Sequence, residues 1–354
     1  MAPKFLLILF LLSAVTAARA SSIPAVFAFG DSTVDPGNNN HLPTLVRGDH
    51  PPYGRNFPGR VPSGRFSDGK LTTDFLVSQL GLKPLLPAYL DPTVTDKDLL
   101  TGASFASAGS GLDEMTATET GTLTMAVQLN HFEEALGRMR RAVGPYEANR
   151  LVGNALFVIA AGTNDMVDNY YDLPTRRATY PMAANYHDFL LGRLESVIRR
   201  LYGMGARKFS LAGLPPIGCL PAQVTVGSFL PSIHMFQRFC VDGQNVESQA
   251  YNAKLQALTS RLQGTLPGAR IAYAEIYNPI LDMIVNPARY GFQQTLQGCC
   301  GSGTLEMGPL CNTWAQTCPD PSKYLFWDSV HPTQAAYSVL ANNFYRTVLP
   351  QLVN

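Results

Sequence analysis

The sequence ALFVIAAGTND, residues 155–165, passes without a break from apolar to polar residues. Its first six residues are wholly apolar, which is typical of a strand buried on both faces of a sheet. The GTND that follows at 162–165 contains the residue types of turns and helix starts. In parallel sheets such turns lie at the carboxyl ends of the strands, where ligands bind. The stretch therefore predicts a buried strand that leads directly into a candidate site.

Four more strand-like runs alternate along the chain with segments of helical period. The strand-like runs are 25–29, 103–107, 208–212 and 270–274. Helix-like segments, with apolar residues three or four apart, lie at 71–80, 129–143, 190–201, 251–262 and 337–348. This strict alternation predicts an α/β fold with a five-stranded parallel sheet and helices on both faces. No repeat, low-complexity linker or charge run divides the sequence, so a single domain is expected over residues 21–354.

Composition argues against two classes of protein. The 354 residues include 27 Lys and Arg against 26 Asp and Glu, a net charge of +1. A nucleic-acid binder that works through phosphate contacts would be strongly basic, and an acidic disordered segment would be strongly negative. Because 46% of the residues are hydrophobic, the chain has ample material for a core. We expect a globular protein that does not bind nucleic acid.

Residues 1–20 have the pattern of a secretory signal peptide. Lys4 supplies a positive charge, residues 5–12 are apolar, and ARA at 18–20 fits the small-x-small cleavage rule. An apolar run of this length is too short for a permanent membrane span. We expect a mature protein that begins near Ser21, has no permanent membrane anchor and enters the secretory pathway, to be secreted or to stay in the ER lumen.

All six cysteines lie in the second half of the chain. They are Cys219, Cys240, Cys299, Cys300, Cys311 and Cys318. An even number in an oxidising compartment favours disulfides. No histidine stands among the last four and their spacing is not that of a zinc site, so no metal is expected. The pairing stays open, because six cysteines can be connected in many ways.

Polar residues follow three of the predicted strands. They are GDSTVD at 30–35, SAGSG at 107–111 and GTND at 162–165. Because the carboxyl ends of parallel strands share one edge of a sheet, these segments are expected to meet there. They offer exposed backbone amides, an amide side chain and a hydroxyl that could act as a nucleophile.

A base for that hydroxyl stands near the C-terminus. A serine is a weak nucleophile and needs an adjacent base. Asp328 precedes His331 by three residues, so its carboxylate could orient the imidazole against Ser32. The G-x-S-x-G elbow of ordinary α/β-hydrolases is absent. The glycine patterns of nucleotide sites are absent too, so no such cofactor is predicted.

Six motifs in a fixed order make the pattern specific. They are FGDS at 29–32 with Asp35 and NN at 38–39, ASAG at 106–109, GTND at 162–165, LPPIGC at 214–219, CCG at 299–301 and FWDSVHPT at 326–333. With this set the chain resembles the plant GDSL esterase/lipase family of the SGNH hydrolase superfamily. The resemblance extends over nearly all of the predicted mature chain.

The resemblance implies a flavodoxin-like, three-layer α/β/α fold, no metal or organic cofactor, and a set of catalytic roles. Ser32 would be the nucleophile. His331 would be its general base and then acid, supported by Asp328. The backbone amides of Ser32 and Gly109 and the side-chain amide of Asn164 would form the oxyanion hole. Three donors of this kind can stabilise a tetrahedral intermediate.

Two positions depart from the family pattern. The fourth residue of GDSL is Thr33 rather than leucine, and Ser104 stands where asparagine is usual. Neither position would carry the chemistry, so activity is still expected, with a changed pocket wall near the nucleophile. Plainer interpretations also exist for the site residues. The serine and glycine could serve turns, Asn164 could cap a helix, and His331 could be a buried structural histidine.

Three functions agree with these residues. A secreted serine esterase or lipase would hydrolyse carboxylic esters, of lipids or of wall polymers, through an acyl-enzyme on Ser32. An acyltransferase would pass the same acyl group to an alcohol in a site that excludes water. A non-catalytic binding protein would use the scaffold alone. No motif selects an acyl chain or an oligomeric state. The first two functions require an activated serine and the third does not, so a test for such a serine distinguishes them.

Overall fold

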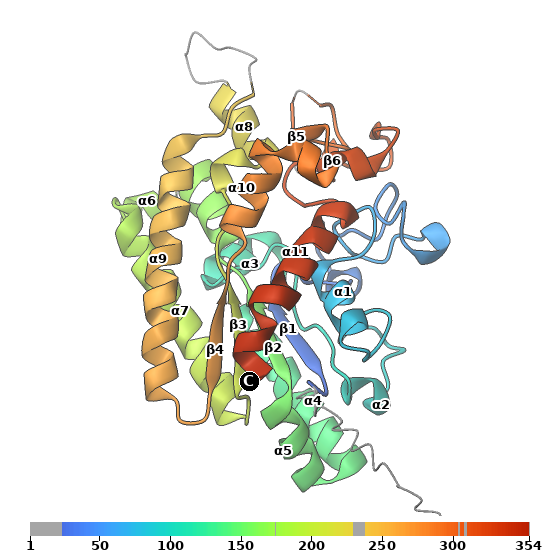
Figure 1. Ribbon diagram of the computed structural model, residues 1–354, viewed down its shortest axis with the longest axis vertical. Helices are drawn as coiled ribbons and strands as arrows, with labels where there is room; N and C mark the ends of the chain where they lie inside the picture. The colour runs from blue at the N-terminus through green and yellow to red at the C-terminus, as the bar shows by residue number, and fades with distance from the viewer. Residues whose placement is uncertain (1–22, 174, 229–237, 304, 308–309, 354) are drawn as a thin grey trace, which may run out of the picture.

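A four-stranded parallel sheet forms the centre of the molecule (Figure 1). The computed structural model describes residues 23–353 apart from 174, 229–237, 304 and 308–309, so the predicted signal peptide lies outside the described residues. The strands are β1 (Val26–Gly30), β2 (Leu156–Ala160), β3 (Lys208–Ala212) and β4 (Arg270–Ala274). They stand in this order, each parallel to the next. The four strand-like runs that form them are strands as predicted.

The remaining predicted strand, at 103–107, forms isolated bridges rather than a regular strand. It runs parallel to β1, and the Phe105 N–H donates to the Ala28 carbonyl at 2.8 Å. Within it only Ser104 forms a bridge with Ala28. On its other side the Asn38 side chain donates to the Ser104 carbonyl at 2.9 Å. The backbone of residues 87–89 pairs on this side too, since the Ser104 N–H donates to the Pro87 carbonyl and the Tyr89 N–H donates to the Ser104 carbonyl, both at 2.9 Å. An isolated bridge and a side chain thus take the place of a regular neighbouring strand. The main sheet therefore has four regular strands where the sequence predicts five.

Helices cover both faces of the sheet, which confirms the α/β class and its three layers. One face is covered by α4 (Met125–Val143), α5 (Pro145–Asn154), α7 (Ala183–Gly203) and α9 (Asp242–Thr265). The other face is covered by α1 (Thr72–Gln79), α11 (Gln334–Thr347) and α12 (Leu349–Val353). The five predicted helices correspond to α1, α4, α7, α9 and α11.

Shorter elements fill the connections. The remaining α-helices are α2 (Asp96–Leu99), α3 (Glu114–Thr120), α6 (Thr175–Thr179), α8 (Pro221–Ser228) and α10 (Tyr277–Val285). The chain also forms the π-helix η3 (Asp165–Asp172) and the 3-10 turns η1 (Asn38–His41), η2 (Pro58–Arg60), η4 (Ile217–Cys219), η5 (Pro287–Tyr290) and η7 (Pro321–Lys323). A second sheet pairs β5 (Gln294–Gly298) with β6 (Tyr324–Phe326) in parallel. None of the predicted strands anticipates this small sheet.

The two faces of the main sheet carry side chains of different size. Toward α4 lies an aromatic cluster with ring centroids 5.1 to 6.3 Å apart, formed by Phe27, Phe29, Phe105, Phe132 and Phe157. Alternate residues of a strand point to opposite faces. The face toward α1 and α11 therefore carries mostly small side chains, among them Ala28, Ala160, Ser210, Ala212 and Ala274. The space between this face and its helices is filled less completely.

All six cysteines are paired, in the disulfides Cys219–Cys240, Cys299–Cys318 and Cys300–Cys311. The last two hold the loops around the small sheet. The Cys299 N–H donates to the Phe326 carbonyl at 3.0 Å, and the Cys300 N–H donates to the Trp327 carbonyl at 2.6 Å. The two bridged residues therefore hold the segment that leads to Asp328 and His331.

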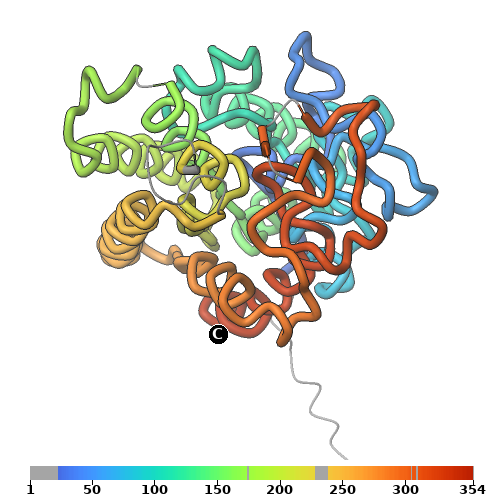
Figure 2. The backbone as a smooth tube through the Cα atoms, turned by 90° about the horizontal axis from the view of Figure 1, so that it is seen from above, coloured from blue at the N-terminus to red at the C-terminus, as the bar shows by residue number. Residues whose placement is uncertain are grey.

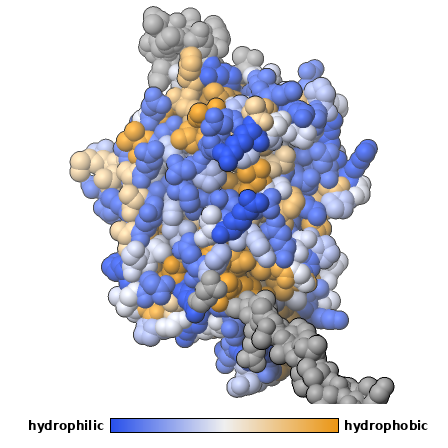
Figure 3. Space-filling model, in the orientation of Figure 1, coloured by the Kyte–Doolittle hydropathy of each residue, from blue (hydrophilic) through white to orange (hydrophobic). Residues whose placement is uncertain are grey.

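The surface is mixed in character. On the face seen in Figure 3, polar side chains predominate and hydrophobic areas show between them. Among the described residues, no helix combines the length and the hydrophobicity that a membrane crossing needs.

Candidate active site

Gly30 determines where the predicted nucleophile lies. It ends β1 with a φ of 130°, and a Cβ at this position would stand 1.8 Å from the carbonyl oxygen of Ala160 in β2. Only glycine permits this approach and this backbone angle without strain. The Asp31 N–H donates to the same carbonyl at 3.0 Å. The chain thus turns over the end of the neighbouring strand and brings Ser32 to the carboxyl edge of the sheet.

Ser32, His331 and Asp328 form a continuous chain of contacts. The Ser32 Oγ lies 2.7 Å from the His331 Nε2, although the two residues are 299 positions apart. The His331 Nδ1 lies 2.8 Å from one carboxylate oxygen of Asp328 and 2.9 Å from the other. With Nδ1 protonated toward the carboxylate, Nε2 is free to accept the serine proton. Figure 2 shows the blue N-terminal loops and the orange-red C-terminal loops side by side, as this contact requires.

The hydrogen bonds and the charge around Asp328 favour its ionised form. The backbone N–H groups of Val330 and His331 donate to its Oδ1 at 2.9 and 2.7 Å. Burial opposes ionisation, but the charge of His331 and the hydrogen bonds from His331 and Val330 hold the pKa of Asp328 below its ordinary value. The side chain of His331 keeps 12% of its surface exposed. The imidazole is therefore buried on the aspartate side and remains open on the other.

Tyr53 is a member of the site that the sequence analysis missed. Its hydroxyl donates to the Asp328 Oδ2 at 2.8 Å, across 275 positions of the chain. Burial, and then the charge of Asp328, raise the pKa of Tyr53 well above its ordinary value, so the hydroxyl keeps its proton. Its neighbours Pro51, Pro52 and Gly54 read as a turn, and neither motif nor periodicity marks this tyrosine. Only the folded chain could identify it.

Removing this hydroxyl is expected to destabilise the protein. In Tyr53→Phe the buried carboxylate loses one of its donors, and hydrogen bonds to charged groups contribute about 1.5–3 kcal/mol. Denaturant unfolding of the variant should show a loss of this size. The matched control is Tyr146→Phe, since Tyr146 is 79% exposed and its hydroxyl has no comparable role. Equal stability of the two variants would contradict the contact.

Three donors are available beside Ser32. The backbone N–H groups of Ser32 and Gly109 have no hydrogen-bond acceptor among the described residues. Gly109 has a φ of 80°, a left-handed conformation that glycine adopts readily. The Asn164 Nδ2 donates one of its hydrogens to the Ser110 carbonyl at 2.9 Å, which orients the carboxamide and leaves its second hydrogen free. The three loops therefore offer two main-chain donors and one side-chain donor.

The plainer interpretation of Asn164 as a helix cap is wrong. Asn164 precedes the π-helix η3, but its own backbone is helical, with φ −63° and ψ −37°, and its side chain makes no capping hydrogen bond. An N-cap residue has extended backbone angles and accepts a hydrogen bond from the first turn. The next residue, Asp165, instead accepts from the Leu112 and Asp113 N–H groups at 2.8 and 2.9 Å. It thereby holds the loop that contains Gly109 against the end of β2.

Asp35 supports the same loop from the other side. Its carboxylate accepts from the N–H groups of Gly37 and Asn38 at 2.8 and 2.7 Å and from that of Ala108 at 3.0 Å. Burial is the main cause that raises the pKa of Asp35 to about 6, and these hydrogen bonds oppose the rise. The Asn39 side chain donates to the Ala108 carbonyl at 2.9 Å. The segment before Gly109 is therefore fixed by side chains of the segment that follows Ser32.

The comparisons with known proteins agree with this geometry. The model of the GDSL-like lipase/acylhydrolase family matches residues 26–344. A GDSL esterase/lipase of Arabidopsis thaliana is 52% identical over 347 residues, which are 98% of this chain and 96% of the relative. A second one from the same plant is 43% identical over 331 residues, 93% of this chain and 91% of the relative. The chain therefore belongs to the GDSL-like lipase/acylhydrolase family and is a carboxylic ester hydrolase.

Proposed function

We propose that this chain is a secreted serine esterase or lipase that forms an acyl-enzyme on Ser32 and acts on acyl esters of lipids or of wall polymers. The observation that carries the proposal is the chain of contacts from Ser32 through His331 to Asp328, with distances of 2.7 and 2.8 Å. A serine in this setting has a base within reach, and that base has an anionic partner.

In the proposed reaction His331 takes the Ser32 proton at Nε2 while the Ser32 Oγ attacks the ester carbonyl carbon. The carbonyl oxygen becomes negatively charged and accepts hydrogen bonds from the Ser32 and Gly109 amides and from Asn164. The intermediate collapses when His331 gives its proton to the departing alcohol oxygen, and the acyl group stays on Ser32. Water then attacks the acyl-enzyme, His331 takes its proton, and the acid leaves as Ser32 is reprotonated. No metal or organic cofactor takes part.

Asp328 keeps its charge throughout this cycle. Its lowered pKa means that it stays ionised while the imidazole becomes cationic, so the ion pair with His331 is strongest when the base holds the serine proton. This is the point at which negative charge also appears on the substrate oxygen. The three disulfides support secretion, since such bonds persist in oxidising compartments.

Labelling with a fluorophosphonate tests the proposal, because this probe reacts with activated serines and not with bystanders. The wild-type protein should be labelled at Ser32, and Ser32→Ala should not be labelled. The matched control is Ser196→Ala, which removes an exposed serine of α7 whose hydroxyl donates to the Gly192 carbonyl. Its labelling should equal that of the wild type. An unlabelled wild type, or a labelled Ser32→Ala, would refute the assignment.

A further inference from the structure

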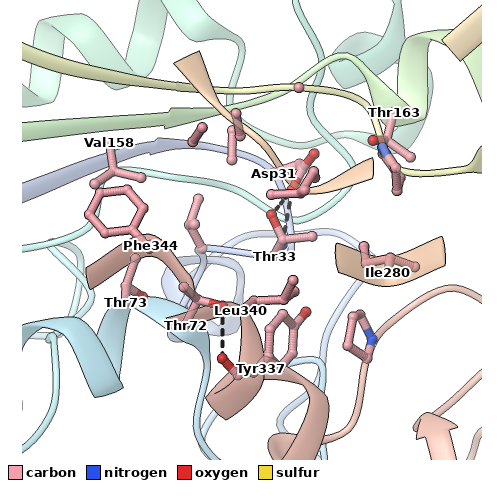
Figure 4. A pocket seen from close by; sticks show the side chains of 18 of the residues that line it. Asp31, Thr33, Thr72, Thr73, Val158, Thr163, Ile280, Tyr337, Leu340 and Phe344 are labelled. Atoms are coloured by element: carbon pink, nitrogen blue, oxygen red, sulfur yellow. Dashed lines mark hydrogen bonds between the residues drawn. The ribbon is translucent and has the colours of Figure 1, made fainter. Parts of the chain in front are cut away.

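A cavity of about 130 Å³ lies between the main sheet and helices α1 and α11. Figure 4 shows Val158 and Phe344 at one end, Thr163 and Ile280 at the other, and Asp31 and Thr33 between them. Its origin is the small side chains of this face of the sheet, such as Ser210 and Ala212, over which the helices cannot close the space. An apolar cavity of similar size, on the order of 150 Å³, binds benzene. The cavity is thus large enough for a hydrocarbon group on the order of six carbon atoms.

Sequence neighbours of the proposed nucleophile, base and side-chain donor line this cavity, whereas those of Gly109 do not. Asp31 and Thr33 flank Ser32, Val330 and Pro332 flank His331, and Thr163 precedes Asn164. One border of the cavity therefore follows the backbone that carries the nucleophile, the base and the side-chain donor. Ser32 itself is not among the lining residues, so a group bound to its Oγ would have to pass Asp31 or Thr33 to enter the cavity.

The deeper part of the cavity is hydrophobic. Leu76 of α1, Leu340 and Phe344 of α11, and Val158 of β2 form its walls. Ser210 also lies there, opposite Val158 in the sheet, and its hydroxyl has no hydrogen-bond partner among the described residues. Such walls favour a hydrocarbon chain over a polar group, because each methylene that leaves water for an apolar surface adds favourable binding free energy.

The border near Ser32 is polar but its groups are occupied. The Thr33 hydroxyl and N–H both donate to the Asp31 Oδ1, at 2.7 and 2.9 Å. Burial raises the pKa of Asp31, and the hydrogen bonds from Thr33 oppose the rise. Thr33 is the departure from the GDSL pattern, and here it satisfies a carboxylate at the cavity wall. An acyl chain that enters the cavity would thus contact the methyl group of Thr33, whose hydroxyl and N–H are already bonded to Asp31.

We propose that this cavity binds the acyl chain of the ester and selects chains of about six carbon atoms, a size set by the benzene comparison above. The inference rests on the proposed Ser32 acyl-enzyme. The acyl group remains attached to Ser32 between the two halves of the reaction, so an apolar pocket near Ser32 can hold it throughout. The alcohol must leave and water must enter, so their path has to reach solvent. The cavity has mostly apolar walls and therefore suits the acyl chain better than the alcohol, which has to exchange with water.

Chain-length profiles test the inference. For p-nitrophenyl esters of the wild type, kcat/KM should rise from the acetyl to the hexanoyl ester and fall for longer chains. Ser210→Ile fills the deep end, adds a β-branched side chain that suits a strand and removes an unpartnered hydroxyl. The ratio of kcat/KM for hexanoyl over acetyl should fall about tenfold, as is usual for a pocket that loses room for a methylene or two.

The opposite change keeps the test decisive if the filled variant folds poorly. Phe344→Leu enlarges the deep end and should move the optimum to longer chains. Ser196→Ala, on the far side of the sheet, should keep the wild-type profile. If the wild type hydrolyses esters and labels at Ser32 but both cavity variants keep its chain-length profile, the cavity inference is refuted and the proposed function stands. If Ser32 is not labelled and no ester is hydrolysed, the proposed function itself fails.

Discussion

Ser32→Ala should abolish ester hydrolysis, with a fall in kcat of at least about 10⁴-fold. The variant loses the only atom that can form the acyl-enzyme, and what remains is the oxyanion hole and substrate binding. The fold should survive, because among the described residues the lost hydroxyl has a hydrogen bond only with the side chain of His331. Initial rates on p-nitrophenyl acetate, with thermal unfolding on the same sample, give both quantities.

Ser196→Ala is the control for the removal of a serine hydroxyl as such. It should match the wild type in rate. A Ser32→Ala protein that keeps more than half of the wild-type rate would overturn the role of Ser32, because an enzyme without its nucleophile cannot hydrolyse the ester at such a rate.

Asn164→Ala should lower kcat by about 10²–10³-fold and leave KM nearly unchanged. The free amide hydrogen of Asn164 gains most when negative charge appears on the substrate oxygen, so the transition state loses more than the bound ester. A loss of this size corresponds to about 3–4 kcal/mol. Ser32 should still be labelled by a fluorophosphonate, at a lower rate. Steady-state kinetics and labelling rates on one purified variant measure both effects.

The matched control is Asn154→Ala. Asn154 also donates its side-chain amide to a backbone carbonyl, that of Arg150 at 2.8 Å, but it lies exposed at the end of α5. Its removal should leave the kinetics unchanged. If Asn164→Ala instead lowers the melting temperature with a normal kcat, then the amide serves only to hold the Ser110 carbonyl, and its place in the oxyanion hole is lost.

The sequence predicts well those features that repeat along the chain. Continuous apolar runs identify β1 and β2, because strands buried on both faces need no polar residues, and shorter apolar runs with a polar residue identify β3 and β4. Apolar residues three or four apart identify α4 and α7, because each of these helices is buried on one side only. The segment at 103–107 shows the limit of this reasoning. Its composition suits a strand, but the Asn38 side chain donates a hydrogen bond to its Ser104 carbonyl. No local pattern in the sequence indicates that contact.

Features that depend on packing between distant segments cannot be predicted from the sequence. Tyr53 reaches Asp328 across 275 positions, and the pairing of the cysteines follows from the course of the loops. The cavity arises from small residues on several strands, each of which alone reads as an ordinary sheet residue. The contact between Ser32 and His331 is the exception. It could be anticipated because both residues stand in motifs whose chemistry requires a partner.

The two disulfides beside the small sheet connect the redox state of the surroundings to the positioning of the base. Cys299 and Cys300 hold Phe326 and Trp327 by backbone hydrogen bonds, and the next residue is Asp328. In a reducing cytosol, with these four thiols free, the loops that brace this segment would be tied only by noncovalent contacts. In such a reduced chain Ser32 would be in place while His331 would be held less firmly. The oxidation state of these four cysteines would thus affect how firmly Asp328 and His331 are placed relative to Ser32.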